Sequence, residues 1–160
     1  MRIIFLDLDG VLVPARLLCR VTAQRESLAE ALEPRAIALL NDLVARAKAQ
    51  IVISSSWREL FELAELRTLL EHAGLCGLIV DMTPIGTPAG GARAAARGHE
   101  IQQWLDQHPA VSSFVILDDA ADMAHLTHRW IRTDIETGLQ PHHVEHALTL
   151  LDGAASADPA

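Results

Sequence analysis

The feature of this sequence that most constrains its fold is an alternation of short apolar segments with helical patterns. The apolar segments are rich in β-branched residues and cover 2–8, 50–56, 75–82 and 113–119, with a weaker fifth at 129–134. Continuous apolar runs of this length are typical of strands buried on both faces of a parallel sheet. Apolar residues at helical spacing fill the intervals, at 34–49, 58–74, 97–109 and 141–152.

This order of elements predicts an α/β protein with a Rossmann-like, doubly wound parallel sheet of about five strands and helices on both faces. We expect one domain over residues 1–152 and a disordered tail over 153–160. The stretches 11–33 and 83–96 contain proline, glycine or mixed polar residues, and we expect them to form irregular loops.

Charge and cysteine content exclude several classes of protein. The chain has 13 Lys and Arg against 21 Asp and Glu, a formal net charge of −8. This balance argues against broad binding to a phosphate backbone, although it leaves room for a local arginine cluster. The two cysteines have no metal-binding or redox spacing, and no apolar run approaches the roughly 18 residues of a membrane span. We therefore expect a cytoplasmic protein without a membrane partner.

Polar residues stand where three of the predicted strands end. They are Asp7, Asp9 and Gly10 after the first strand, Ser54, Ser55, Ser56 and Arg58 after the second, and Asp118, Asp119 and Asp122 after the fourth. Ligands of open α/β sheets bind beyond the carboxyl ends of the strands, so these groups are predicted to meet at one edge. Each group alone could be a turn or a helix cap, but three such groups at strand ends favour a shared site.

The chemistry of these residue types points to phosphoryl transfer. Clustered carboxylates repel one another unless a hard cation lies among them, and Mg²⁺ prefers carboxylates together with phosphate oxygens. A carboxylate can also attack phosphorus, and serine hydroxyls can hold phosphate oxygens. Arg97, at the start of the helical pattern 97–109, supplies a positive charge, and Arg58 is a second candidate.

Four of these stretches, in this order, resemble the motifs of the haloacid dehalogenase (HAD) superfamily of aspartate-nucleophile phosphotransferases. They are FLDLDGVL, IVISSS, Arg97-Gly98 and VILDD, and together they span residues 3 to 122. The phrases SSSWR, RGHEIQQWL and RTDIETGL resemble a narrower branch, the small HAD-type domains associated with RNA repair proteins.

The resemblance implies a role for each matching residue. Asp7 would be the nucleophile that forms an aspartyl-phosphate, and Asp9 the general acid and base. Mg²⁺ would be held by the Asp7 carboxylate, the backbone carbonyl of Asp9, and Asp118 or Asp119. The enzyme would be a phosphatase, a phosphoric monoester hydrolase of the superfamily.

Three assignments stay open at this point. Counting from the strand favours Ser54 as the phosphate-binding serine, whereas anchoring on Trp57 favours Ser55; Arg97 would hold the phosphate with it. Asp122 is a third candidate for the metal carboxylate. Arg58 is a weaker candidate for contacting substrate.

The spacing of the motifs bears on the substrate. The intervals from Gly10 to Ser55 and from Arg58 to Arg97 have no room for the cap domain that many members of the superfamily carry. An open site suits a phosphate on a large partner, such as an RNA or DNA end, which arginines 16, 20, 25 and 93 could meet. The alternatives are a phosphatase of small molecules such as nucleotides, and a non-catalytic binding or regulatory module. His142, His143 and His146 have a spacing that could bind a transition metal, but a polar helix face is favoured.

Overall fold

A computed structural model describes residues 1–17, 28–86 and 96–153 of the protein. Its centre is a sheet of five strands: β1 (Arg2–Leu6), β2 (Gln50–Ile53), β3 (Ile79–Met82), β4 (Ser113–Asp118) and β5 (Trp130–Arg132). The strand order is β3-β2-β1-β4-β5, and every neighbouring pair is parallel. The structure therefore confirms the α/β class and the doubly wound parallel sheet expected from the sequence.

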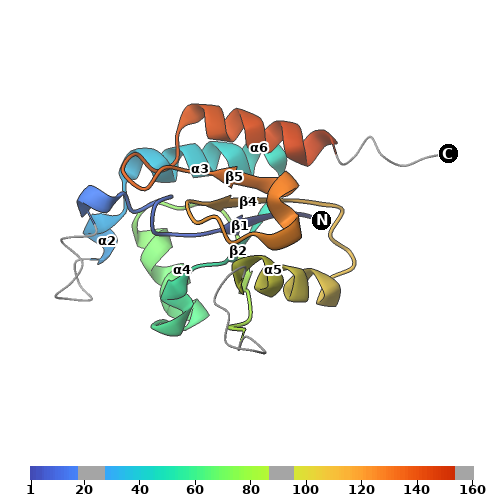
Figure 1. Cartoon of the computed structure of the whole chain (residues 1–160). Helices are drawn as coiled ribbons and strands as arrows, with labels where there is room; N and C mark the ends of the chain where they lie inside the picture. The colour runs from blue at the N-terminus through green and yellow to red at the C-terminus, as the bar shows by residue number, and fades with distance from the viewer. Residues whose placement is uncertain (18–27, 87–95, 154–160) are drawn as a thin grey trace.

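Helices cover both faces of the sheet (Figure 1). The helical segments are α2 (Leu28–Ala31), α3 (Pro34–Ala47), η2 (Ser56–Glu59), α4 (Leu63–His72), α5 (Ala96–Gln107), η3 (Ala124–Arg129) and α6 (Pro141–Gly153). Helices α3 and α6 lie side by side over one face, and α5 lies over the other (Figure 1). Pro34 occupies the first turn of α3, where its missing N–H costs nothing.

Successive residues of the central strand β1 face opposite cores. Ile4 and Leu6 pack into the larger core with α3, α4 and α6, whereas Ile3 and Phe5 pack into a smaller one with α5 and η3. The smaller core contains Trp104, which is 3% exposed and meets the Phe5 ring edge-on, at 5.4 Å between centroids. Because both faces are covered, β1 has no polar alternation, as its sequence indicates.

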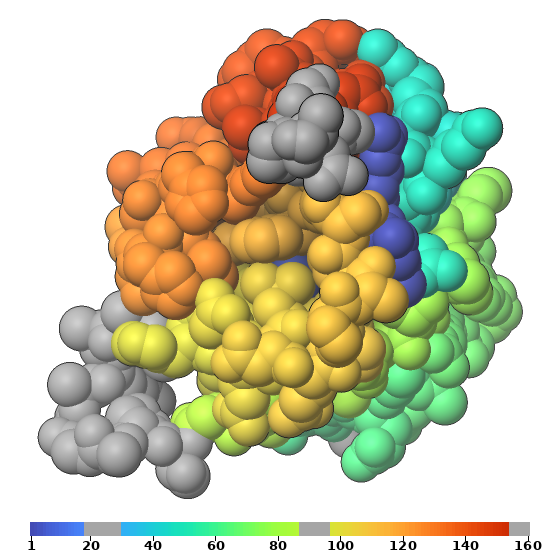
Figure 2. Space-filling model, turned by 90° about the vertical axis from the view of Figure 1, so that its right-hand side faces the viewer, coloured from blue at the N-terminus to red at the C-terminus, as the bar shows by residue number. Residues whose placement is uncertain are grey.

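Because the strands are parallel, they all begin at one edge of the sheet and all end at the opposite edge. Figure 2 looks onto the edge where the strands begin, with the N-terminal residues (blue) between α6 (red) and α5 (yellow). The terminal amine donates hydrogen bonds there to the Ala110 carbonyl (3.1 Å) and the Ser112 hydroxyl (3.2 Å). The predicted site residues all lie at the opposite edge, where the strands end.

The predicted helix 58–74 begins later than its sequence pattern suggests. Residues Ser56–Glu59 form the 3-10 turn η2, and α4 starts only at Leu63. Ser55 accepts a hydrogen bond from the Trp57 N–H at the start of η2, and a capping box between Glu62 and Glu65 starts the α-helix. The helix ends at His72 with Ala73 as its cap residue, and Gly74 follows in the left-handed region with a φ of +95°, the conformation for which glycine is favoured after a helix.

Some expectations fall on parts of the chain outside the described residues. These include Arg20, Arg25 and Arg93, much of the loops 11–33 and 83–96, and residues 154–160 of the expected tail. Within the described ranges, no insertion forms a cap domain over the sheet. Nor does any helix there have the length and apolar character needed to cross a membrane.

Candidate active site

The candidate site lies where the order of the strands reverses, between β1 and β4. From β1 the chain proceeds outward to β2 and β3 on one side, and then to β4 and β5 on the other. Asp7 directly follows β1 and Asp118 ends β4, and the Asp7 N–H donates to the Leu117 carbonyl at 3.0 Å. Such a reversal opens a crevice at the carboxyl ends of the strands, which is where ligands bind in sheets of this type.

Three carboxylates meet in this crevice. One oxygen each of Asp7, Asp118 and Asp119 lies within 4.8 Å of the others. Asp118 is fully buried, and its Oδ2 has no hydrogen-bond partner among the described residues. Asp122 takes a different place: its Oδ2 accepts from the Arg97 N–H (3.4 Å), at the start of α5. Of the three acids after β4, Asp118 and Asp119 therefore lie with Asp7, and Asp122 caps a helix.

Burial raises the pKa values of the buried carboxyl groups. Burial is the main cause that raises the pKa of Asp7 to about 6 and that of Asp118 to about 8. Arg97 opposes the rise at both groups, whereas the charge of Asp7 adds to it at Asp118. One arginine thus only partly compensates three neighbouring acids. An all-oxygen donor set with an unpartnered buried oxygen fits a hard divalent cation such as Mg²⁺.

Arg97 lies between the two buried acids. It belongs to the first turn of α5, with Nη1 3.7 Å from Asp7 Oδ1 and Nε 3.7 Å from Asp118 Oδ2. Its buried Nη1 makes no hydrogen bond to a described residue. These separations exceed hydrogen-bonding distance, so the guanidinium retains donors for an anion that enters the crevice.

Gly98 explains how Arg97 comes so close to the cluster. A Cβ at this position would overlap the backbone carbonyl of Met123, in the segment that follows β4. The Gly98 N–H donates to the Asp122 carbonyl at 3.1 Å. Only glycine therefore lets the start of α5 rest on the segment that carries Asp118 and Asp119.

The serines after β2 have separate environments. The Ser55 side chain is hydrogen-bonded to the Asp7 carboxylate, which lowers the pKa of Asp7 against the larger effect of burial. Ser54 is fully buried, its N–H donates to the Leu6 carbonyl (2.8 Å), and its hydroxyl has no partner among the described residues. The structure thus brings Ser55 against Asp7, while it places Ser54 within the continuation of the sheet.

Asp9 has a partner that the sequence reasoning did not identify. The Trp57 indole N–H lies 3.0 Å from both carboxylate oxygens of Asp9. Burial raises the pKa of Asp9, and the hydrogen bond from Trp57 opposes this. A contact across 48 positions leaves no local signal in the sequence. The Asp9 carboxylate stands outside the cluster formed by Asp7, Asp118 and Asp119.

Gly10 makes the sharp turn after Asp9 possible. Its φ is +70°, in the left-handed region, and a Cβ would lie 2.5 Å from the Asp119 Cγ. The glycine of the first motif is therefore required both by its own backbone angle and by the close approach of Asp119.

Arg58 lies away from this crevice. Its guanidinium is buried, donates to the Thr83 hydroxyl at 2.6 Å, and forms an ion pair with Glu100 of α5. Glu100 in turn accepts from the Gly86 N–H (2.9 Å). Through these contacts Arg58 links η2 to α5 and to the residue that follows β3. Its donors are therefore engaged within the protein, and we do not propose that Arg58 contacts the substrate. Arg16 is likewise engaged, in an ion pair with Glu33.

The five-stranded parallel sheet with helices is consistent with the fold of the HAD-superfamily hydrolases. The family model described as "HAD domain in Swiss Army Knife RNA repair proteins" matches residues 3–144, and the chain belongs to this family. No curated protein matches the sequence. The match confirms both the superfamily and the narrower, RNA-repair-associated branch that the motifs resemble.

Proposed function

We propose that the protein is a Mg²⁺-dependent phosphatase that uses Asp7 as its nucleophile. The observation that carries this proposal is the surroundings of Asp7, a buried carboxylate with Arg97 on one side, Ser55 against it, and Asp118 and Asp119 beside it. An attacking carboxylate, a cation site and a phosphate-binding arginine are the main requirements of phosphoryl transfer.

In the first step, an Asp7 oxygen would attack the phosphorus, and the bond from phosphorus to the ester oxygen would break. Asp9 would donate its proton to the departing oxygen, which leaves as an alcohol, with the phosphoryl group on Asp7. Arg97 and Ser55 would hold the non-bridging phosphate oxygens. In the second step, Asp9 would take a proton from a water that attacks the phosphorus, which releases phosphate and restores the Asp7 carboxylate.

The carboxylates of Asp7, Asp118 and Asp119, with the backbone carbonyl of Asp9 that the family resemblance implies, would hold Mg²⁺. When bound, the ion would supply positive charge against the phosphate. The environment of Asp9 suits its double role. Burial raises its pKa and favours the proton that the first step needs, while the Trp57 hydrogen bond supports the carboxylate that the second step needs.

The test is phosphate release from an aryl phosphate with Mg²⁺, comparing the unmodified protein with Asp7→Asn. We expect Asp7→Asn to lower kcat by a factor of about 10³ or more, because an amide cannot form the aspartyl-phosphate. Asp106→Asn is the matched control, since Asp106 is an exposed acid on α5 whose carboxylate accepts a hydrogen bond from the Gln102 side chain. Turnover in Asp7→Asn equal to that of the control would refute the nucleophile assignment.

We further propose phosphorylated ends of RNA or DNA as the substrate. Two observations support this: the matched family is described from RNA repair proteins, and the described part of the chain forms no cap over the site. The test compares kcat/KM for oligonucleotide ends with kcat/KM for free nucleotides. Equal values would favour the alternative, a phosphatase of small nucleotides.

A further inference from the structure

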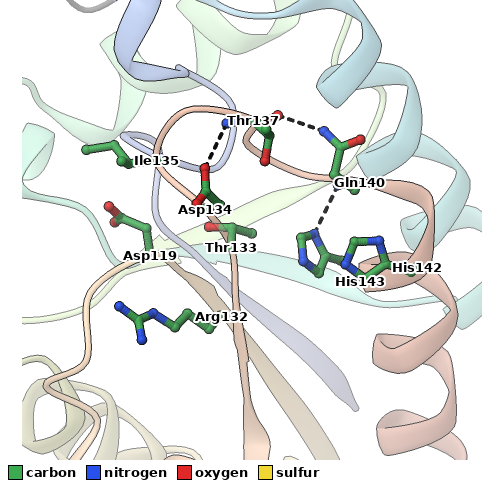
Figure 3. A pocket seen from close by; sticks show the side chains of 9 residues that line it. All are labelled: Asp119, Arg132, Thr133, Asp134, Ile135, Thr137, Gln140, His142 and His143. Carbon is green, nitrogen blue, oxygen red and sulfur yellow. Dashed lines mark hydrogen bonds between the residues drawn. The ribbon is translucent and has the colours of Figure 1, made fainter.

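A hollow of about 400 Å³ lies directly beside the acid cluster and shares Asp119 with it. Its other walls come from the end of β5, the loop that follows, and the start of α6. Figure 3 shows Asp119 and Arg132 on one side, Gln140, His142 and His143 on the other, and Thr133 between them. Its volume lies in the range of sites that bind small organic ligands.

The loop that forms this hollow is held in place by its own hydrogen bonds. Asp134 Oδ1 accepts from the N–H groups of Glu136 (2.9 Å) and Thr137 (3.2 Å), and the Gly138 N–H donates to the Asp134 carbonyl (2.7 Å). Gln140 Nε2 donates to the Thr137 carbonyl at 2.7 Å (Figure 3). The hollow is therefore formed before a ligand arrives.

Gly138 joins this loop to the catalytic segment. Its φ is +65°, and a Cβ would lie 2.7 Å from the Val11 carbonyl. The Val11 carbonyl accepts a hydrogen bond from the Leu139 N–H (2.9 Å). Val11 lies two residues after Asp9 in the chain. The hollow is thus anchored to the turn that follows the proposed acid and base.

Arg132 supplies a cation to the hollow, and its charge opposes the rise that burial causes in the pKa of Asp119. Its side chain is exposed, its guanidinium carbon lies 5.7 Å from the centroid of the Trp130 ring, and no described carboxylate lies within ion-pair distance. In a chain of formal net charge −8, an exposed arginine that has no close ion pair among the described residues and lies over a ring beside a polar hollow favours an anionic ligand group.

The other wall residues suit a sugar rather than a purely apolar group. The Thr133 hydroxyl has no partner among the described residues, so a hydrogen bond to a ligand would displace none. His143 Nδ1 accepts from the Gln140 N–H at 3.0 Å, which leaves Nε2 as the donor of the neutral ring. Ile135 is 43% exposed and adds an apolar contact. Ribose and deoxyribose offer hydroxyl groups that Thr133 and His143 could bind, and C–H groups that Ile135 could contact.

We propose that this hollow binds the nucleoside from which phosphate is removed, and that Arg132 binds a second phosphate on that nucleoside. The inference rests on the proposed phosphatase function. A phosphate held by Arg97 and Ser55 for attack by Asp7 would lie next to the acid cluster, and the hollow begins at Asp119 of that cluster, so it is within reach of the ester-linked group. The substrate class is then a terminal nucleotide with one phosphate to be removed and another that links it to a strand.

Binding to Asp7→Asn with Mg²⁺ tests this directly, because it needs no turnover. The probes are adenosine 3′,5′-bisphosphate and the two adenosine monophosphates, 3′ and 5′. We expect the bisphosphate to bind at least tenfold more tightly than the better monophosphate. Adding Arg132→Ala should remove that advantage, and Arg132→Lys should retain part of it. Lys48→Gln removes a positive charge at the opposite edge of the sheet and should leave the advantage intact.

Equal binding of bisphosphate and monophosphates would overturn the proposal, as would an advantage that survives Arg132→Ala. The melting temperature of each variant shows whether the exposed substitution has disturbed the fold. Failure of the phosphatase function is a separate result, because it would be seen as aryl phosphate turnover that does not depend on Asp7.

Discussion

At the scale of single residues, the buried acids of the site make stability depend on pH. Asp7 and Asp118 have pKa values of about 6 and about 8 in the folded protein, against 3.8 ordinarily. Between pH 4 and 8 the folded state therefore binds more protons at these groups than the unfolded state does. The stability that these two groups contribute is thus full below about pH 4 and is lost as pH rises toward 8.

Mg²⁺ should reverse this loss. A cation among the acids stabilises their charged forms, and it competes with protons at low pH but not at high pH. We therefore expect Mg²⁺ to raise the free energy of unfolding more at pH 8 than at pH 5, measured by urea unfolding with Mg²⁺ or with EDTA. An increase that is equal at both pH values, or larger at pH 5, would contradict the cation site. Asp118→Asn should reduce the effect.

The hydrogen bond from Trp57 to Asp9 makes a second prediction at this scale. Trp57→Phe keeps an aromatic ring but removes the donor that stabilises the Asp9 carboxylate. The pKa of Asp9 should rise further, so the pH optimum of kcat should move upward and kcat should fall roughly tenfold. Trp104→Phe is the matched control, since that indole donates to Asp81 (2.7 Å), away from the acid cluster. A pH profile that shifts equally in both variants would refute the role of Trp57.

At the scale of elements, the site depends on how closely α5 packs on the segment after β4. Gly98→Ala would push the helix away from the Met123 carbonyl and would move Arg97 away from Asp7 and Asp118. We expect a loss of stability of about 1–3 kcal/mol, the usual result of overpacking, and a lower affinity for inorganic phosphate. Unfolding in urea and phosphate titration measure the two effects.

Gly153→Ala is the control for this substitution. Gly153 also lies in a helix, at the end of α6, but a Cβ there would meet nothing within 4 Å. Alanine should be neutral or slightly stabilising at that position, because it has the better helix propensity. If Gly98→Ala proved as harmless as Gly153→Ala, the close packing of α5 would not be what positions Arg97.

At the scale of the whole molecule, net charge and the open site together predict an unusual salt dependence. A chain with a formal net charge of −8 repels a polyanion, and added salt screens that repulsion. The ratio of kcat/KM for a phosphorylated 20-mer to that for a mononucleotide should therefore rise between low and physiological ionic strength. A steep fall in this ratio would instead indicate an extended basic interface for the strand.

The overall fold could be predicted from sequence because its signals are local. The apolar runs that became β1 and β4, the proline that begins α3 and the glycine that ends α4 each act within a few residues. The doubly wound topology adds one general rule, that parallel strands end at the same edge. That rule was enough to expect Asp7 and Asp118 in one crevice, since each stands at the end of a strand, whereas Arg97 was expected there from the need for a positive charge and from the family resemblance.

Contacts between side chains of distant segments could not be predicted in this way. Arg58 stands in the sequence beside the site serines, yet it turns inward to Glu100, because a buried ion pair with α5 was available only in three dimensions. In the same way, only the packing of Asp119 against Gly10, and the place of Asp122 at the start of α5, separated the acids after β4.

The sequence alone thus determined the class of fold, the edge of the sheet that carries the site, and the residue types gathered there. Strand periodicity, helix boundaries and glycine conformations depend on residues that are close in sequence, so the sequence is sufficient to predict them. The tertiary structure alone decided that Ser55 rather than Ser54 meets Asp7, that Trp57 holds Asp9, and that Arg132 faces the hollow beside Asp119. Each of these depends on the direction of a side chain relative to a segment far away in sequence, and only packing sets that direction.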